Sequence, residues 1–254
     1  PPLVGTLRDL FALSNLEIGL LMGAIAVPAI VLSVPLGAAL DRWPPRAAGL
    51  AALGVMLVGA VVFALAPTYL ALLAGRLLFG AGGLLMNLLL ARLLTAAFAG
   101  RELALAMGLF TGTYPASMIV LFSAHPWLAA HLGWRGELGM LAALVAVAIP
   151  LHALAVPAGP PGAATPSRGL RLGIPAPLVA LGVAWMLYFA AFAAVPTFAP
   201  ERAGGGAHGL LVTSVVTWVA LVATPLAGLA IDRSGRAERW VVAGLALLAA
   251  TLGA

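Results

Sequence analysis

Long apolar stretches of about 20 residues, nearly free of charged side chains, dominate this sequence. A helix of about 20 apolar residues crosses the hydrocarbon core of a bilayer, which is about 30 Å thick. The last stretch is shorter than such a crossing requires. The sequence therefore predicts an all-α polytopic membrane protein with about seven full transmembrane helices and a partial eighth. The predicted spans are 18–40, 47–66, 68–90, 103–124, 138–156, 177–199, 209–231 and the incomplete 240–254.

Composition excludes most other classes of protein. Of the 254 residues, 63% are hydrophobic and 8% are charged, whereas a soluble domain carries about 25% charged residues. There is no Cys, and no P-loop, nucleophile elbow or metal-ligand spacing is present. We therefore expect no enzyme, no metal and no cofactor. The net charge of +5 comes from scattered Arg rather than a basic run, so the expected partner is the lipid bilayer and not nucleic acid.

The distribution of Arg predicts the orientation of the chain. If the loop at 41–46 is cytoplasmic and the sides alternate, most Arg fall in cytoplasmic loops and span ends, which agrees with the positive-inside rule. The outside then holds Arg8, Arg135 and Arg202, while Arg76 lies within a span. The predicted location is a plasma or inner membrane. The inside set is Arg42, Arg46, Arg92, Arg101, Arg168, Arg171, Arg233, Arg236 and Arg239.

One polar stretch and one weak repeat divide the chain. Residues 157–174 are rich in Pro, Gly, Ser and Thr, which predicts a flexible cytoplasmic linker. It separates an N-terminal half, 1–156, from a partial C-terminal half, 175–254. The repeat consists of a Gly four residues before an Asp-Arg pair, with another Arg shortly after. It occurs once in each half and implies a parallel repeat of six helices. Its residues are Gly37, Asp41, Arg42 and Arg46, then Gly228, Asp232, Arg233 and Arg236.

This repeat resembles the signature loops of the major facilitator superfamily. The segment Gly37 to Arg46 is similar to the loop between helices two and three, and Gly228 to Arg236 is similar to its degenerate copy between helices eight and nine. The run from Arg76 to Gly82 is similar to the family's helix-four motif, and Gly133-Trp134-Arg135 to the turn before helix six. The resemblance implies a bundle in which this chain holds helices two to eight and the start of nine. We therefore expect a fragment that lacks helix one and helices ten to twelve.

The resemblance implies a gating role for the repeated residues. In the family, the Asp of the first loop pins helix two to the partner half in the outward-open state. Physically, a carboxylate can cap a helix N-terminus and pair with Arg. The alternative for Asp41, Arg42 and Arg46 is ordinary anchoring of a cytoplasmic loop. The second occurrence, at Asp232 and Arg233, favours gating.

Arg76 is the leading candidate for substrate binding. A charge in mid-membrane costs at least about 2.5–3.5 kcal/mol, so it must face the bundle interior or a wet cavity. Arg76, Gly80, Gly83 and Asn87 recur at helical spacing and share one face. That face either lines a cavity, where Arg76 binds an anionic group or couples to a proton site, or packs against a neighbouring helix through its Gly residues.

Aromatic residues supply weaker candidates. Tyr114, in the fourth span, is a candidate cavity residue. Trp185 and Tyr188 share a face of the predicted helix seven, which the resemblance places at the cavity, although such aromatic stripes more often face lipid or packing surfaces. His152 is a weak candidate for proton linkage. No Asp or Glu falls within a predicted span, so proton coupling stays possible without an assigned site.

The sequence thus predicts a secondary transporter of a small solute that works by alternating access, and monomeric when full length. A small organic or inorganic anion is the preferred substrate because of Arg76, and the outer segment 2–9 with the Leu13-Ser14 pair resembles cyanate and nitrate-type carriers. Two alternatives stay open. One is a drug or metabolite efflux antiporter, and the other is a non-transporting sensor or scaffold on the same fold.

Overall fold

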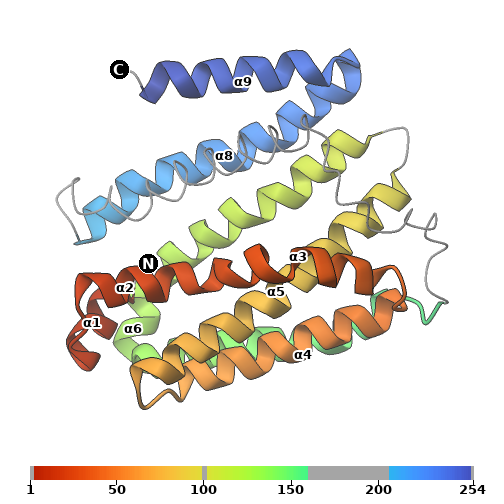
Figure 1. The fold of residues 1–254 in the computed structure, drawn as a ribbon. Helices are drawn as coiled ribbons and strands as arrows, with labels where there is room; N and C mark the ends of the chain where they lie inside the picture. Colours follow the sequence, from red (N-terminus) through yellow and green to blue (C-terminus); the bar gives the residue numbers. More distant parts are fainter. Residues whose placement is uncertain (1–2, 99–101, 160–205, 253–254) are drawn as a thin grey trace. The chain divides into compact units, whose positions relative to one another are not determined.

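The computed structural model describes residues 3–98, 102–159 and 206–252, and every regular element in these ranges is helical (Figure 1). Four helical stretches are long and apolar enough to cross a membrane: Asn15–Leu40, Pro45–Ala64, Tyr69–Ala97 and Leu103–Ala155. The prediction of a helical, multi-pass membrane protein is confirmed. The count of about seven spans stays a prediction, because 177–199 lies outside the described residues. The elements are α1 (Val4–Phe11), α2 (Asn15–Gly23), η1 (Ala24–Ala26), α3 (Val27–Leu40), α4 (Pro45–Ala64), α5 (Tyr69–Ala97), α6 (Leu103–Ala155), α8 (Gly206–Ser234) and α9 (Ala237–Leu252).

The residues before the first predicted span, 18–40, form the short helix α1. Its Leu7 is 1% exposed and belongs to an apolar cluster with residues of α2, α4, α5 and α6. Burial of this side chain stabilises a helix that is too short to form alone. A capping box then starts α2, since the Ser14 hydroxyl accepts from the Glu17 N–H and the Glu17 carboxylate accepts from the Ser14 N–H.

The first predicted span is a continuous run of α2, η1 and α3. The short 3-10 helix η1 lies just before Pro28, which is at the start of α3. A proline lacks the N–H for the helical hydrogen bond and disfavours the α conformation in the residue before it, so a local change of helix type is expected there. Gly80 of α5 packs against the backbone of Ile25 in η1.

The helix α6 corrects the prediction that residues 125–137 form a loop. It continues from Leu103 to Ala155 and departs from helical angles only at Gly133, with φ 62° and ψ 178°. This region of the backbone map is essentially restricted to Gly. The turn predicted at Gly133 is therefore present, but the residues on both sides of it are helical. Pro126, a residue type that often ends a helix, lies within α6.

The chain divides into two compact units. One contains residues 2–93 and 125–167, and the other contains 94–124 and 168–254, together with residue 1. The first unit has two apolar cores. One gathers α1, α2, α4, α5 and the second half of α6, and the other gathers α3, α4 and α5. The division expected from the sequence, 1–156 and 175–254 around a linker, stays a prediction.

Small residues bring the helices of the first unit close together. A Cβ on Gly75 of α5 would lie 2.7 Å from the Phe63 nitrogen of α4, so only Gly allows this approach. Large apolar side chains face outward instead, among them Ile30 at 82% and Leu154 at 84% exposed. An outer surface of this kind is stable in lipid and unfavourable in water, which agrees with the membrane prediction.

Candidate functional site

Arg76 lies inside the first unit, on α5, with apolar neighbours. Its Nη2 lies 3.9 Å from the Met22 sulfur, and its Cζ lies 5.6 Å from the centre of the Phe63 ring. The buried Nε has no hydrogen-bond partner. Among the residues that the structure describes, no carboxylate forms an ion pair with Arg76. A buried donor without a partner costs about 1–3 kcal/mol, and a cation–π contact does not neutralise the charge.

The predicted face of α5 has two different environments. Gly80 is buried against Ile25 and serves packing, whereas a Cβ on Gly83 would meet nothing within 4 Å. Asn87 is exposed. It lies eleven residues beyond Arg76, about 16 Å along the helix axis. The structure therefore does not bring Asn87 to the guanidinium, and its role as a substrate ligand stays a prediction.

The first signature loop is tied to its own unit. Asp41, directly after α3, forms an ion pair with Arg92 of α5, with 3.4 Å between Oδ1 and Nη1. Arg92 also donates to the Leu40 carbonyl. Both side chains are about one-third exposed, at 37% and 30%, so the pair contributes modestly to stability. The contact of Asp41 with the partner half, implied by the resemblance, stays a prediction.

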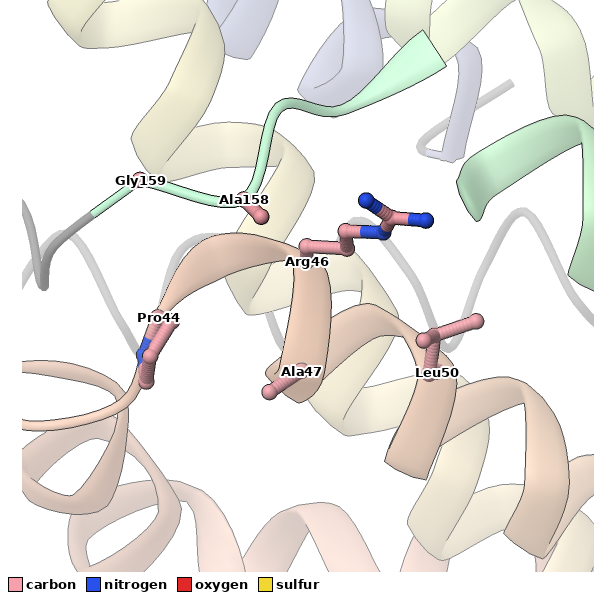
Figure 2. A pocket seen from close by; sticks show the side chains of 6 residues that line it. All are labelled: Pro44, Arg46, Ala47, Leu50, Ala158 and Gly159. Atoms are coloured by element: carbon pink, nitrogen blue, oxygen red, sulfur yellow. The ribbon is translucent and has the colours of Figure 1, made fainter. Parts of the chain in front are cut away.

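The other residues of this loop are more open. A Cβ on Gly37 would meet nothing within 4 Å, and Arg42 is exposed. Arg46, at the start of α4, lines a cavity of about 340 Å³ (Figure 2). The remaining walls are Pro44, Ala47, Leu50, Ala158 and Gly159. Arg46 therefore supplies the one charged side chain of an otherwise apolar hollow between the beginning of α4 and the segment after α6.

The second signature loop makes a direct contact within the other unit. Asp232, near the end of α8, accepts hydrogen bonds from the first backbone N–H groups of α6. Its Oδ1 lies 3.1 Å from the Ala104 nitrogen, and its Oδ2 lies 2.7 Å from the Leu105 nitrogen. These N–H groups lack partners inside their own helix, and the helix N-terminus carries partial positive charge. The Asp232 carboxylate accepts from these N–H groups, and its negative charge interacts favourably with the positive end of the helix.

Glycines allow α8 to approach α6 this closely. A Cβ on Gly228 would lie 2.9 Å from the Leu105 Cα, and a Cβ on Gly108 would lie 2.7 Å from the Thr224 carbonyl oxygen. Gly228, four residues before Asp232, therefore allows the close packing of α8 on α6 that the hydrogen bonds of Asp232 need. Arg233 and Arg236 of the same motif are exposed.

The aromatic candidates are only partly described. Tyr114 lies on α6 and is 41% exposed, and its carbonyl accepts from the Ser117 hydroxyl at 2.7 Å. Trp185 and Tyr188 lie outside the described residues. None of these positions can be assigned to a cavity from its contacts, so their substrate role stays a prediction.

Sequence reasoning missed one pair of titratable side chains, His125 and Glu137. Glu137 was expected in a loop, but it lies in α6 and is 6% exposed. Its carboxylate oxygens lie 2.9 and 3.0 Å from Nδ1 of His125. The signal in the sequence was a His and a Glu on either side of a Gly at which a helix could reverse. The interpretation of residues 125–137 as a loop between two spans concealed this pair.

His152 is buried, 9% exposed, and its Nε2 has no hydrogen-bond partner among the described residues. Its ring fills the space that a side chain on Gly49 of α4 would occupy. The absence of a side chain on Gly49 therefore lets the end of α6 pack closely against α4.

In the described part of the chain, the long apolar helices, an arginine without a carboxylate partner and an aspartate that caps a helix are features of a multi-pass membrane protein. The whole chain, residues 1–254, matches the sequence profile of the Major Facilitator Superfamily. The protein belongs to this superfamily of membrane transporters, as the signature loops indicated. No curated protein and no solved structure matches the chain.

Proposed function

We propose that this protein is a secondary transporter of a small organic or inorganic anion and that Arg76 is the cationic group that binds it. The observation that carries the proposal is the guanidinium of Arg76, which lies beside Met22 and Phe63 and has no carboxylate partner among the described residues. A charge buried without a counter-ion is strongly destabilising. A bound anion of matching size relieves that cost, and the planar fork of Arg is suited to carboxylate-like and oxyanion groups.

Alternating access is the proposed mechanism, with Asp232 as a latch. By the predicted division of the chain, α6 begins in the N-terminal half and α8 belongs to the C-terminal half. The hydrogen bonds from Ala104 and Leu105 to Asp232 would then hold the two halves together at one end of the membrane. Opening that end breaks these bonds, and closing it forms them again. The Asp41–Arg92 pair keeps the first loop in place within its own half.

Further features of the proposal come from the sequence. The Arg distribution favours a plasma or inner membrane with 157–174 on the cytoplasmic side, and the similarity to cyanate and nitrate-type carriers favours a small, delocalised anion. The working unit is a monomer of the full-length protein. Asn87, Tyr114, Trp185 and Tyr188 are secondary candidates for substrate contacts.

Uptake into proteoliposomes tests the anion proposal. We expect accumulation of at least one anion from a panel of formate, acetate, cyanate, nitrate and small dicarboxylates. Arg76→Gln lowers its initial rate about tenfold or more, since 1.4 kcal/mol of lost binding is tenfold. Arg76→Lys retains the charge without the fork and gives an intermediate rate. Arg8→Gln, which removes an exposed arginine of α1, is the matched control and leaves uptake unchanged.

The same experiment separates the alternatives. If Arg76→Gln leaves the transport rate of every tested anion unchanged, the anion proposal is wrong. Export of cationic or neutral drugs favours an efflux antiporter, and an absence of flux for every solute favours a sensor or scaffold.

A further inference from the structure

Among the residues that the structure describes, Glu137 is the one carboxylate that it buries, at 6% exposed. Glu17, the other acid within the candidate membrane spans, is only partly buried and accepts a hydrogen bond from the Ser14 N–H at the start of α2. A carboxylate inside a membrane helix is costly and marks proton relays and ion pathways. Glu137 is therefore a functional candidate on burial alone.

Its partner His125 gives the position a specific chemistry. Twelve residues of uninterrupted helix would separate the two by about 18 Å, yet Nδ1 lies 2.9 Å from Oε2. The reversal at Gly133 is what brings them together. When the carboxylate is ionised it only accepts hydrogen bonds. In that state Nδ1 of His125 is the donor to Glu137, and Nε2 is the nitrogen that can bind a further proton.

We propose that His125 and Glu137 form a proton-binding site of this transporter. The inference rests on the proposed function and deepens it by naming the coupling site. A proton from water binds Nε2 of His125, which converts a neutral imidazole beside a carboxylate into an imidazolium–carboxylate pair. The net charge of the pair changes from −1 to zero, and release of the proton reverses the step. The His125 side chain is 15% exposed and Glu137 6%, so the proton enters through the histidine.

Coupling to a proton suits an anion carrier. A monovalent anion that moves with one proton carries no net charge across the membrane, so its passage is not opposed by the membrane potential. In this arrangement Arg76 binds the anion, and the pair in α6 binds the proton.

Several other charged or titratable groups lie on α6 near the pair or on the elements packed against it. Leu138, next to Glu137, packs in the cluster formed with α1, α2, α4 and α5. Within the described ranges, the phenol of Tyr69 donates to the Glu17 carbonyl, and the guanidinium of Arg135 lies over the Trp134 ring. The groups on these elements are Arg8, Asp9, Glu17, Arg46, Tyr69, Arg76, Arg92, Tyr114, His131, Arg135 and His152.

Nuclear magnetic resonance of ¹⁵N-labelled histidine, with the protein in lipid nanodiscs, measures proton binding directly. The chain has 4 His, and loss of a signal in His125→Gln assigns it. We expect the His125 signal to change with pH as the ring binds a proton, and to respond differently in Glu137→Gln, because the imidazolium loses its counter-ion. His131 lies on the same helix, with Nδ1 on the Trp127 carbonyl, and its signal should respond to pH in the same way in both proteins.

Transport then tests the coupling. We expect the rate of anion uptake to rise several-fold as the outer pH falls, and Glu137→Gln or His125→Gln to abolish that dependence. His131→Gln, the matched control, retains it. The double variant His125→Glu/Glu137→His restores the pair and recovers part of the pH dependence of uptake. A thermal melt in nanodiscs shows that each variant is folded before its flux is measured.

The proton site, its coupling role and the proposed function can each fail separately. A His125 signal that does not change with pH, or that responds to pH in the same way in Glu137→Gln, overturns the proton site. A pH profile of uptake unchanged in folded Glu137→Gln overturns its coupling role. An absence of any anion flux in the unaltered protein refutes the proposed function instead, and the titration still decides whether the pair binds a proton.

Discussion

Removal of the Asp232 carboxylate tests the latch most directly. Asp232 accepts two backbone hydrogen bonds at the start of α6, at 3.1 and 2.7 Å. A hydrogen bond to a charged group contributes about 1.5–3 kcal/mol when it is shielded from water. Asp232 is exposed, so solvent screening reduces the contribution of the two bonds together to about 1–2 kcal/mol.

That energy determines the size of the expected effect. If both bonds exist only when this end of the transporter is closed, their loss shifts the ratio of open to closed forms. A change of 1–2 kcal/mol corresponds to about a 5- to 30-fold shift. Asp232→Ala, which removes both bonds, should give the full shift of about 5- to 30-fold. Asp232→Asn retains an amide oxygen that accepts one of the bonds, so it should give a smaller shift.

Thiol labelling can measure this shift because the chain has no Cys of its own. A cysteine in place of Thr224, which is half-buried on α8 beside Gly108, becomes accessible only when α8 and α6 separate. We expect its rate of reaction with a water-soluble maleimide to rise by about 5- to 30-fold in Asp232→Ala.

Glu238→Gln is the matched control, since it removes an exposed acid at the start of α9. It should leave the labelling rate unchanged. If Asp232→Ala also leaves the rate within twofold of the parent, the two bonds do not hold the closed form and the latch is refuted.

Two backbone predictions concern packing and the turn of α6. Gly133→Ala should lower the melting temperature, because a side chain is strained by about 1–3 kcal/mol at φ 62° and ψ 178°; Gly139→Ala, where a Cβ meets nothing within 4 Å, should not. Gly49→Ala should also lower the melting temperature, because the new methyl group displaces the ring of His152 at an overpacking cost of about 1–3 kcal/mol. Gly54→Ala on the same helix, with open space at its Cβ, is the control, and equal melting temperatures for Gly49→Ala and Gly54→Ala would contradict the packing argument.

Much of the fold was predictable from local signals. Apolar stretches of membrane length become α2–α3, α4, α5, the two limbs of α6 and α8, because in lipid every backbone group must find its hydrogen bond within the helix. The Gly133 turn was predictable for the same local reason, since few residues other than Gly adopt its backbone angles. The family followed from the signature loops. The helical extension from 125 to 132 was not predicted, because Pro126 resembles a stop signal when its neighbours are unknown.

The partners of the charged side chains were decided by the tertiary structure. The sequence identified Asp41 and Asp232 as a repeated pair, but one binds Arg92 and the other binds the N-terminus of α6. Glu137 was concealed in a supposed loop until the turn at Gly133 brought it to His125. Local propensity and hydropathy fix helices one at a time, within a few turns of chain. Which side chains meet depends on the register between helices that are distant in sequence, and only packing sets that register.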